Sequence, residues 1–321
     1  MPAVSVIIPA YNCERFIGEA LQSVLEQSFR DFEIVVVDDG STDGTSDIVN
    51  SFTGPITCYR QPNKGAAAAR NLGLSLAKGD WVALLDADDA WYPNKLSTQI
   101  EYIKLHPETF FVYSDIDVID GHSEIQQRSF LTAGQRKPTW RPFPLSARTR
   151  RPTFVSIVFN GQPFPYPSTV LARRDLLLRA GGFNPAFQSN YHEDFEFFAR
   201  LIRLSEMRFI PQALVKYRAH PPPRDKSVRH QNWFKLLQSL TDLWSDDQEK
   251  KQLLQRQFAK YYARLTRERL LAGDLGAAAD YFRQACRYRP QSWRGFWSWL
   301  VLFRPNRRDL HAVKQRWLED R

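Results

Sequence analysis

The 321-residue sequence contains few cysteines and no long hydrophobic segment. Its three cysteines, Cys13, Cys58 and Cys286, have no paired spacing, which argues against a disulfide framework and favours a reducing compartment. The amino-terminal stretch lacks a basic region followed by a long apolar run, so it predicts a first strand and not a signal peptide. No apolar run approaches the roughly 18 residues needed to cross a bilayer. We therefore expect a cytoplasmic protein that is not integral to a membrane.

The net positive charge comes from the last third of the chain. Residues 1–227 contain 25 Lys and Arg and 25 Asp and Glu, whereas residues 228–321 contain 19 and 10. The net charge of +9 therefore comes from the second of these segments. Such an asymmetry is typical of a tail that meets an anionic surface, either lipid or nucleic acid. No nucleic-acid recognition motif accompanies the charge, so we expect no nucleic-acid partner.

The first part of the chain alternates short apolar runs with stretches of helical spacing. Continuous runs of Val, Ile and Leu are typical of strands buried on both faces of a parallel sheet. Regular alternation with helices indicates right-handed βαβ units, so the fold class is α/β, with a mostly parallel, Rossmann-like sheet flanked by helices. We predict strands at 4–8, 33–37, 56–60 and 81–85, and helices at 15–27, 43–51 and about 66–77.

The pattern changes after Pro93. Residues 125–152 contain seven basic residues, four prolines and no acidic residue, which predicts a basic loop. The three prolines at 221–223 indicate a domain boundary, and from about residue 230 we expect an α-helical extension containing a helical hairpin packed on the preceding domain. In between, we predict helices at 95–105, 173–179 and 193–204, and strands at 110–115, 168–171 and 215–218.

Two acidic signatures lie about fifty residues apart, and each follows a predicted strand. Asp38 and Asp39 follow the second strand, and Asp86, Asp88 and Asp89 follow the fourth. The carboxyl ends of parallel strands meet at one edge of a sheet, where ligands bind. Carboxylates gathered there repel each other unless a cation lies between them, and the usual cation is a hard divalent metal that carries a phosphate ligand. The sequence thus predicts chemistry on a nucleotide diphosphate.

Five motifs in a fixed order give the sequence a family resemblance. They are VSVIIPAYN at 4–12, VDDGSTD at 37–43, NKG at 63–65 with ARNLG at 69–73, LDADD at 85–89 and HEDF at 192–195. Over about residues 4–220 the chain resembles the family 2 glycosyltransferases of the GT-A fold. The resemblance implies a nucleotide-sugar-binding half at 1–105, an acceptor-binding half at 106–227 and a basic helical extension at 228–321.

The resemblance implies donor-binding roles for five residues. Pro9 and Tyr11 follow the first strand, and the Tyr11 ring would stack on a nucleobase or pack on a neighbouring loop. Asp39 would accept a hydrogen bond from a base N–H group, while Asp38 caps its turn. Asp86 would contact the ribose. Arg70, on the helix after the NKG motif, would brace the acidic cluster or approach phosphate.

The resemblance also implies a metal site and a catalytic base. Asp88 would bind Mg²⁺ or Mn²⁺, and His220, in a Tyr-Arg-X-His segment, would complete the metal shell, contact the diphosphate or act as a structural donor. Asp194 aligns with the base of the family, and its place in the first helical turn would favour the ionised form that a base requires. Glu193 is either a second catalytic group or a helix-terminal charge.

Taken together, these expectations describe an inverting, metal-dependent glycosyltransferase. It would move a sugar from a nucleotide diphosphate donor, UDP above all, to a carbohydrate or lipid-linked acceptor in surface polysaccharide or glycolipid synthesis. One alternative is a sugar nucleotidyltransferase, although the Gly-rich loop usual in that class is replaced by PAYNC at 9–13. The other is an inactive scaffold, which has no chemical need for Asp39, Asp86, Asp88 and Asp194 together.

An aromatic stripe lies near the carboxyl end of the chain. Aromatic bulk flanked by arginines suits an interfacial helix on anionic lipid, which would place the protein peripherally on the inner face of the cytoplasmic membrane. The alternative is a core stripe that packs on the preceding domain. The stripe consists of Trp293, Phe296, Trp297, Leu300 and Phe303.

Overall fold

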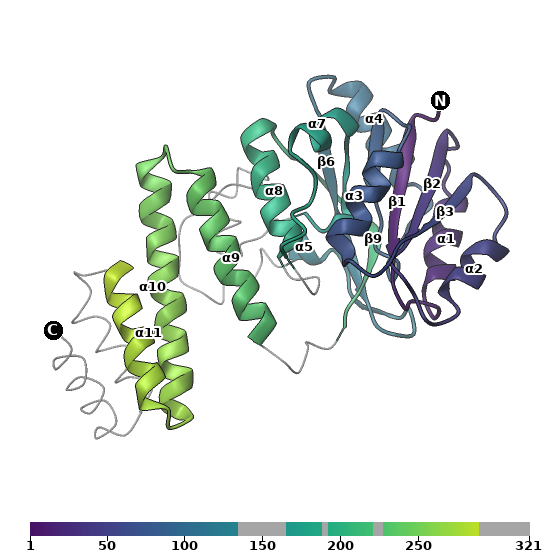
Figure 1. Ribbon diagram of the computed structural model, residues 1–321. Helices are drawn as coiled ribbons and strands as arrows, with labels where there is room; N and C mark the ends of the chain where they lie inside the picture. Colours follow the sequence, from purple (N-terminus) through teal and green to yellow (C-terminus); the bar gives the residue numbers. More distant parts are fainter. Residues whose placement is uncertain (134–164, 188–191, 221–226, 289–321) are drawn as a thin grey trace. The chain divides into compact units, whose positions relative to one another are not determined.

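The computed structural model describes residues 1–133, 165–187, 192–220 and 227–288 (Figure 1). The chain forms two compact units, Met1–Leu236 and Leu237–Arg321. Helix α9 (Ser227–Leu243) begins in the first unit and ends in the second.

The first unit is built on one nine-stranded sheet. The strands are β1 (Val4–Ala10), β2 (Phe32–Asp38), β3 (Ile56–Arg60), β4 (Trp81–Leu84), β5 (Ala90–Trp91), β6 (Phe111–Ile119), β7 (Ile125–Gln127), β8 (Leu171–Arg173) and β9 (Arg208–Arg218). Their order is β3-β2-β1-β4-β8-β6-β9-β5, with β7 beside β6. Strands β3, β2, β1 and β4 pair in parallel, whereas β8 pairs antiparallel with both β4 and β6. The predicted α/β class is confirmed, with parallel pairing in the first half and mixed pairing in the second.

Helices connect the parallel strands, as the alternating pattern predicted. The helices of this unit are α1 (Ile17–Leu25), α2 (Thr45–Ser51), α3 (Ala66–Leu76), α4 (Lys95–Leu105), α5 (Phe130–Ala133), α7 (Arg174–Arg179) and α8 (Glu193–Leu204). Helices α4 and α8 have the predicted bounds. Part of the predicted basic loop is instead strand β7 and helix α5, and its remainder from residue 134 lies outside the described residues.

Two strand predictions are corrected by the structure. Residues Pro167–Thr169 form a 3₁₀ turn, and the strand begins only at Leu171, because proline fixes φ and favours the first position of a helical turn. Strand β9 begins at Arg208, seven residues before the predicted start. Its pairing with β6 shifts register around Pro211, and a proline in a bulge hides the strand pattern from the sequence.

Helix α3 packs closely on strand β1 at Gly73. A Cβ atom at Gly73 would lie 2.4 Å from Cγ2 of Ile7, well inside van der Waals contact. Ala69, on the same helix, packs with Val35 and Val37 of β2 in the core. Glycine at this position therefore lets α3 lie directly against strand β1.

The described part of the second unit contains the predicted helical hairpin. Helices α10 (Gln248–Leu271) and α11 (Leu275–Tyr288) pack together, and Gly273, with φ of +76°, lies in the turn between them. The Tyr288 ring stacks on Phe258 with 4.6 Å between ring centroids. No helix among the described residues is long and apolar enough to cross a bilayer. The aromatic stripe at 293–303 lies outside the described residues.

Candidate functional site

The carboxyl ends of β2, β1 and β4 bring the two acidic signatures to one edge of the sheet. Strand β1 lies between the other two, with Ala10 opposite Asp38 and Ile7 opposite Leu84. The register is extended past the strand ends, because the backbone N–H of Asp39 donates to the Ala10 carbonyl at 2.8 Å. The predicted meeting of the two signatures is therefore confirmed, with Pro9 and Tyr11 between them.

Asp38 holds the first acidic turn together. Its side chain is fully buried, and it accepts hydrogen bonds from the Ser41 backbone N–H at 2.9 Å and from the Ser46 hydroxyl. Burial opposes ionisation, but these hydrogen bonds outweigh it and hold the pKa of Asp38 below its usual value. The predicted turn-capping role of Asp38 is confirmed.

Asp39 fastens the first turn to the segment that precedes α3. Its Oδ1 atom accepts hydrogen bonds from Gln61 Nε2 at 2.6 Å and from the Lys64 backbone N–H at 2.9 Å. Its Oδ2 atom accepts one from the Gly65 backbone N–H at 2.8 Å. Contact between Asp39 and a nucleobase stays a prediction. To make this contact, the carboxylate would accept a further hydrogen bond in addition to these three.

Tyr11 stands at the rim, on a turn tied to the first acidic signature. Its side chain is 50% exposed. The next residue, Asn12, has a φ of +48°, donates its backbone N–H to Ser41 Oγ and accepts from the Thr42 backbone N–H. Asparagine is among the few non-glycine residues that adopt this conformation readily. The turn leaves the Tyr11 ring half-exposed, as stacking on a planar ligand requires.

Asp89 anchors the second acidic turn. It is buried, and its two oxygens accept hydrogen bonds from Ser168 Oγ at 2.6 Å and from the Arg218 backbone N–H at 2.8 Å. Burial, followed by the charges of Asp88 and Asp86, raises the pKa of Asp89 well above its usual value. Asp89 thus joins the turn to the 3₁₀ segment and to the end of β9.

Arg70 connects the second acidic turn to helix α8. Its buried guanidinium donates to Asp86 Oδ1 at 2.7 Å and to Glu193 Oε1 at 3.0 Å. Burial opposes the charged form of Arg70, but the two carboxylates outweigh it and raise its pKa. Burial also raises the pKa of Asp86 in spite of the attraction of Arg70. Of the two predicted roles of Arg70, the structure shows the bracing of the acidic cluster. It also assigns Glu193 to that ion pair.

Asp194 follows Glu193 in the first turn of α8, next to this ion pair. Burial, and then the neighbouring charge of Glu193, raise the pKa of Asp194 to about 7. Burial therefore acts against the ionised form that the helix terminus is expected to favour. A helix end contributes about 0.3–1 kcal/mol at a surface position, less than one pKa unit of about 1.4 kcal/mol, so loss of solvent dominates. Asp194 Oδ1 accepts a hydrogen bond from the Phe195 backbone N–H at 2.8 Å.

Asp88 and His220 meet at the solvent-facing side of the second turn. His220 Nε2 lies 2.7 Å from Asp88 Oδ2, and the two side chains are 51% and 35% exposed. A carboxylate oxygen and an imidazole nitrogen suit Mn²⁺, and the carboxylate suits Mg²⁺. No cluster of three or more His, Cys, Asp or Glu side chains suited to a metal occurs among the described residues. The pair therefore fits a cation that takes its other ligands from phosphate and water, as Mg²⁺ usually does.

Two residues of this site carried no role in the sequence analysis. Ser168 Oγ bridges the second turn by donating to Asp89 and accepting from the Asp86 backbone N–H at 3.0 Å. Arg218 is 1% exposed and binds the backbone of the same turn. The only sequence signal for Arg218 was its place in the Tyr-Arg-X-His segment, and Ser168 had none.

The fold is similar to that of known glycosyltransferases. A mannosyltransferase of Pyrobaculum calidifontis, solved in complex with GDP-Man and Mn²⁺, superposes with a TM-score of 0.55 at 20% sequence identity. The superposition covers 100% of this chain and 88% of that one. The chain thus has the GT-A fold with an α-helical carboxyl-terminal region, as the sequence predicted.

The sequence comparisons agree with the fold. An uncharacterized glycosyltransferase of Rickettsia typhi is 30% identical over 76% of this chain and 71% of its own. The Escherichia coli UDP-Glc:alpha-D-GlcNAc-diphosphoundecaprenol beta-1,3-glucosyltransferase WfaP is 44% identical over 36% of this chain and 46% of its own. The model of the family described as "Glycosyl transferase family 2" matches residues 5–177, more than half of the sequence. The chain belongs to glycosyl transferase family 2.

Proposed function

We propose that this chain transfers a sugar, with inversion, from a UDP-sugar to a hydroxyl group of a carbohydrate or lipid-linked acceptor. One observation carries the proposal: Arg70 bridges Asp86 and Glu193, and so holds the second acidic turn beside the start of α8, where Asp194 lies. A donor-binding carboxylate and a base are thereby kept at one site. The name of WfaP, a relative, specifies a UDP-Glc donor and a diphosphoundecaprenol acceptor, which supports both parts of the proposal.

The donor would lie along the edge formed by β2, β1 and β4. The half-exposed Tyr11 ring would stack on the base, Pro9 would line the same end of β1, and Asp39 would accept from a base N–H. Asp86 would contact the ribose with whichever of its lone pairs Arg70 does not use. In this arrangement residues 1–105 bind the donor and residues 106–227 bind the acceptor.

Asp194 would act as the base. The acceptor oxygen forms a bond to the anomeric carbon while the bond from that carbon to the diphosphate oxygen breaks. The hydroxyl proton passes to an Asp194 carboxylate oxygen, and the bonding electron pair leaves with the nucleoside diphosphate. A single displacement inverts the configuration and needs one carboxylate, with no second residue as nucleophile.

Asp88 and His220 would hold Mg²⁺ or Mn²⁺, whose charge offsets that of the diphosphate. Their exposure leaves both side chains accessible to an incoming ligand. Asp88 and His220 are not part of the Arg70 ion pair. Arg70 therefore holds protein carboxylates in place, while Asp88 would be available to bind the metal and its diphosphate ligand.

The basic extension at 228–321 would bring the enzyme to its acceptor. With a lipid-linked acceptor, an excess of Lys and Arg would favour the anionic inner face of the cytoplasmic membrane. Surface polysaccharide or glycolipid synthesis is the process in which such an acceptor would be used.

Calorimetric titration of UDP, GDP and dTDP, each with and without Mn²⁺, tests the proposal. We expect Mn²⁺-dependent binding of UDP, with weaker binding of the other two. Preferential binding of GDP or dTDP would contradict the donor assignment alone. Failure of a well-folded sample to bind any of the three would contradict the proposed activity.

A further inference from the structure

Arg218 occupies the centre of a polar network beside the second acidic turn. Its backbone N–H donates to Asp89 Oδ1 at 2.8 Å, and its Nε atom donates to the Asp88 carbonyl at 2.8 Å. Arg218 therefore forms hydrogen bonds with two consecutive residues of the turn, Asp88 and Asp89. Two residues later in the chain, His220 reaches the Asp88 carboxylate.

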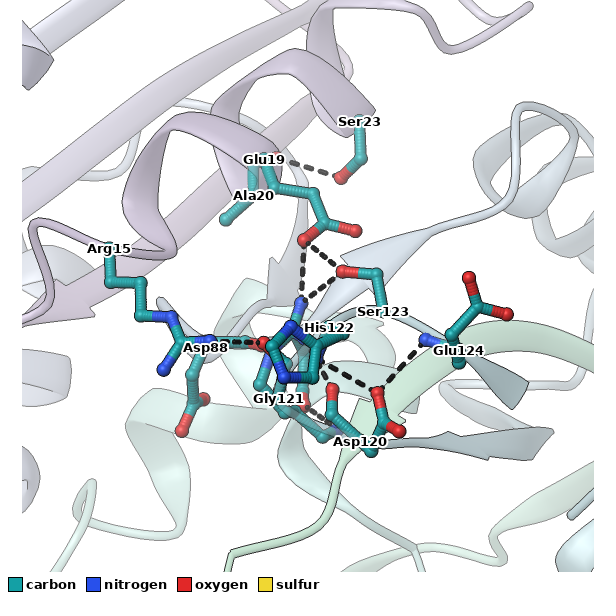
Figure 2. Close-up of polar contacts among 12 residues, drawn as sticks. Arg15, Glu19, Ala20, Ser23, Asp88, Asp120, Gly121, His122, Ser123 and Glu124 are labelled. Carbon is teal, nitrogen blue, oxygen red and sulfur yellow. Dashed lines mark hydrogen bonds and ion pairs between the residues drawn. The ribbon is translucent and has the colours of Figure 1, made fainter. Parts of the chain in front are cut away.

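The outer end of Arg218 is fixed by two other parts of the fold. Nη1 donates to the Asp120 carbonyl, just beyond β6, at 2.6 Å. Nη2 donates to Glu19 Oε2 of α1 at 2.6 Å and to Ser123 Oγ at 3.1 Å. Ser123 Oγ also donates to Glu19 Oε2 at 2.8 Å, and Figure 2 shows this contact between Glu19 and Ser123. The network thus uses all three nitrogens of the guanidinium.

Arg218 and His220 both contact the ring of Phe16. The centroid of the Phe16 ring lies 4.4 Å from Arg218 Cζ and 6.3 Å from the His220 ring, which it meets edge-on. Arg218 is thereby linked to both members of the exposed pair, to Asp88 through its backbone and to His220 through chain connection and a shared aromatic neighbour.

The contacts of Arg218 need the geometry of a guanidinium. They point in three directions from one planar group, to Asp88, to Asp120 and to Glu19 with Ser123. Lysine has the same charge, but its three N–H donors radiate from a single nitrogen and cannot span these partners. A charge-preserving substitution therefore separates the shape of Arg218 from its charge.

We propose that Arg218 is a positioning residue that keeps Asp88 and His220 close enough to each other to bind one divalent cation. The inference rests on the proposed function, because it assumes that this pair binds the metal. Arg218 contacts neither substrate nor metal in this scheme. It acts through the Asp88 peptide and through the strand end that carries His220.

The test compares Arg218→Lys with wild type by the affinity for Mn²⁺, measured by electron paramagnetic resonance in the presence of UDP. Loss of residues that orient metal ligands usually weakens metal affinity by about 10- to 100-fold, and we expect a loss in that range. UDP binding without metal should be unchanged, because the contacts of Tyr11 and Asp39 do not involve Arg218. Glu19→Gln, which removes only the charge partner, should give a smaller loss and serves if Arg218→Lys does not fold.

Arg200→Lys is the matched control. Arg200 also pairs with a glutamate, Glu196, at 2.7 Å, donates to the Gly182 carbonyl at 2.7 Å and lies over a phenylalanine ring, that of Phe197. It makes no contact with the Asp86–Asp89 turn. Its replacement should lower thermal stability and leave Mn²⁺ affinity unchanged.

The outcomes distinguish this inference from the function on which it rests. If wild type binds Mn²⁺ and both Arg218→Lys and Glu19→Gln match it within about twofold, far below the usual loss, the positioning role is overturned and the metal site stands. An equal loss in Arg200→Lys would overturn it too, because general destabilisation would then explain the effect. If wild type itself takes up no Mn²⁺ with UDP, the metal assignment fails and the inference fails with it.

Discussion

The two acidic turns at the edge of the sheet have similar composition and opposite electrostatics. In the first, Asp38 and Asp39 are buried and accept hydrogen bonds from backbone and side-chain donors, and the pKa of Asp38 is lowered. In the second, burial raises the pKa of Asp86 and Asp89, and Asp88 meets only the exposed His220 among the described side chains.

The difference lies in the supply of donors and not in the carboxylates. A carboxylate surrounded by N–H and O–H groups is a structural element, because its charge is already solvated by the protein. Carboxylates crowded together with few donors still need positive charge. In the second turn Arg70 supplies positive charge to the Asp86 carboxylate, and the Asp88 carboxylate is left accessible. The comparison therefore makes Asp38 a structural residue and leaves Asp88 available to a ligand.

The largest effect is expected at Asp194, which Arg70 and Glu193 keep beside the second turn. Asp194→Asn preserves shape but cannot take a proton, so kcat should fall by about 10²–10⁴, the usual contribution of a general base. UDP affinity should stay near that of wild type, because Asp194 lies outside the proposed donor contacts. Initial-rate kinetics and calorimetry on the same sample would show both. Equal loss of UDP binding would contradict the division of roles.

The pH dependence of activity should reflect the raised pKa of Asp194, about 7. The base must be ionised to accept the acceptor proton, so kcat/KM should be constant above about pH 7 and fall about tenfold per unit below it. A rate profile from pH 5 to 9, in buffers of constant ionic strength, measures the midpoint. A midpoint near 4 would show that the first helical turn, and not burial, sets the pKa.

Asp88→Ala should remove metal-dependent binding without weakening the fold. UDP affinity in Mn²⁺ should return to the metal-free value, because His220 alone is left at the site. The Asp88 side chain is one-third exposed and satisfies no buried donor, so the free energy of unfolding should change by less than about 0.5 kcal/mol. Calorimetry and urea unfolding give the two values. Retained Mn²⁺ dependence would assign the metal to other residues.

Asp38→Ala should lower the stability of the fold, whereas Asp88→Ala should lower metal-dependent binding. The Asp38 substitution leaves the Ser41 N–H and the Ser46 hydroxyl without their acceptor, at a cost of about 1–3 kcal/mol in the free energy of unfolding. Because the folded pKa of Asp38 is lowered, its stabilising effect is present above the unfolded pKa of about 4 and is lost as pH falls. The difference from wild type in urea unfolding should therefore shrink at acid pH. If Asp38→Ala and Asp88→Ala were equally stable, the two turns would not differ as described.

Local pattern was enough to predict much of the fold. The strand at 56–60 and the helices at 95–105 and 193–204 have the predicted bounds, because their signals are periodic and lie within one segment. The two-residue strand β5 was not predicted, since a stretch so short has no period. Strand β9 was predicted at less than half its length because Pro211 interrupts its pattern at a bulge.

The site was predictable as a set of residues but not as a set of contacts. The order of the motifs and the positions of the strand ends predicted that Asp86, Asp88 and Asp194 belong to one site. The raised pKa of Asp194 could not be predicted from the sequence. It depends on burial by residues that pack around α8, and the sequence near Asp194 does not indicate which residues these are. The contact between Arg218 and Glu19 joins residues 199 positions apart, and nothing near either residue in the sequence indicates its partner.

Because Gly73 has no side chain, helix α3 packs close to strand β1. This short distance between helix and sheet also fixes the position of the Arg70 guanidinium, which lies on the same helix. Arg70 is one helical turn before Gly73 on the same helix, and it reaches Asp86 and Glu193 because the backbone three residues on rests against Ile7. A methyl group at 73 would act as a spacer between helix and sheet. The position of the Arg70 charge at the proposed donor site therefore depends on Gly73, a residue that has no side chain.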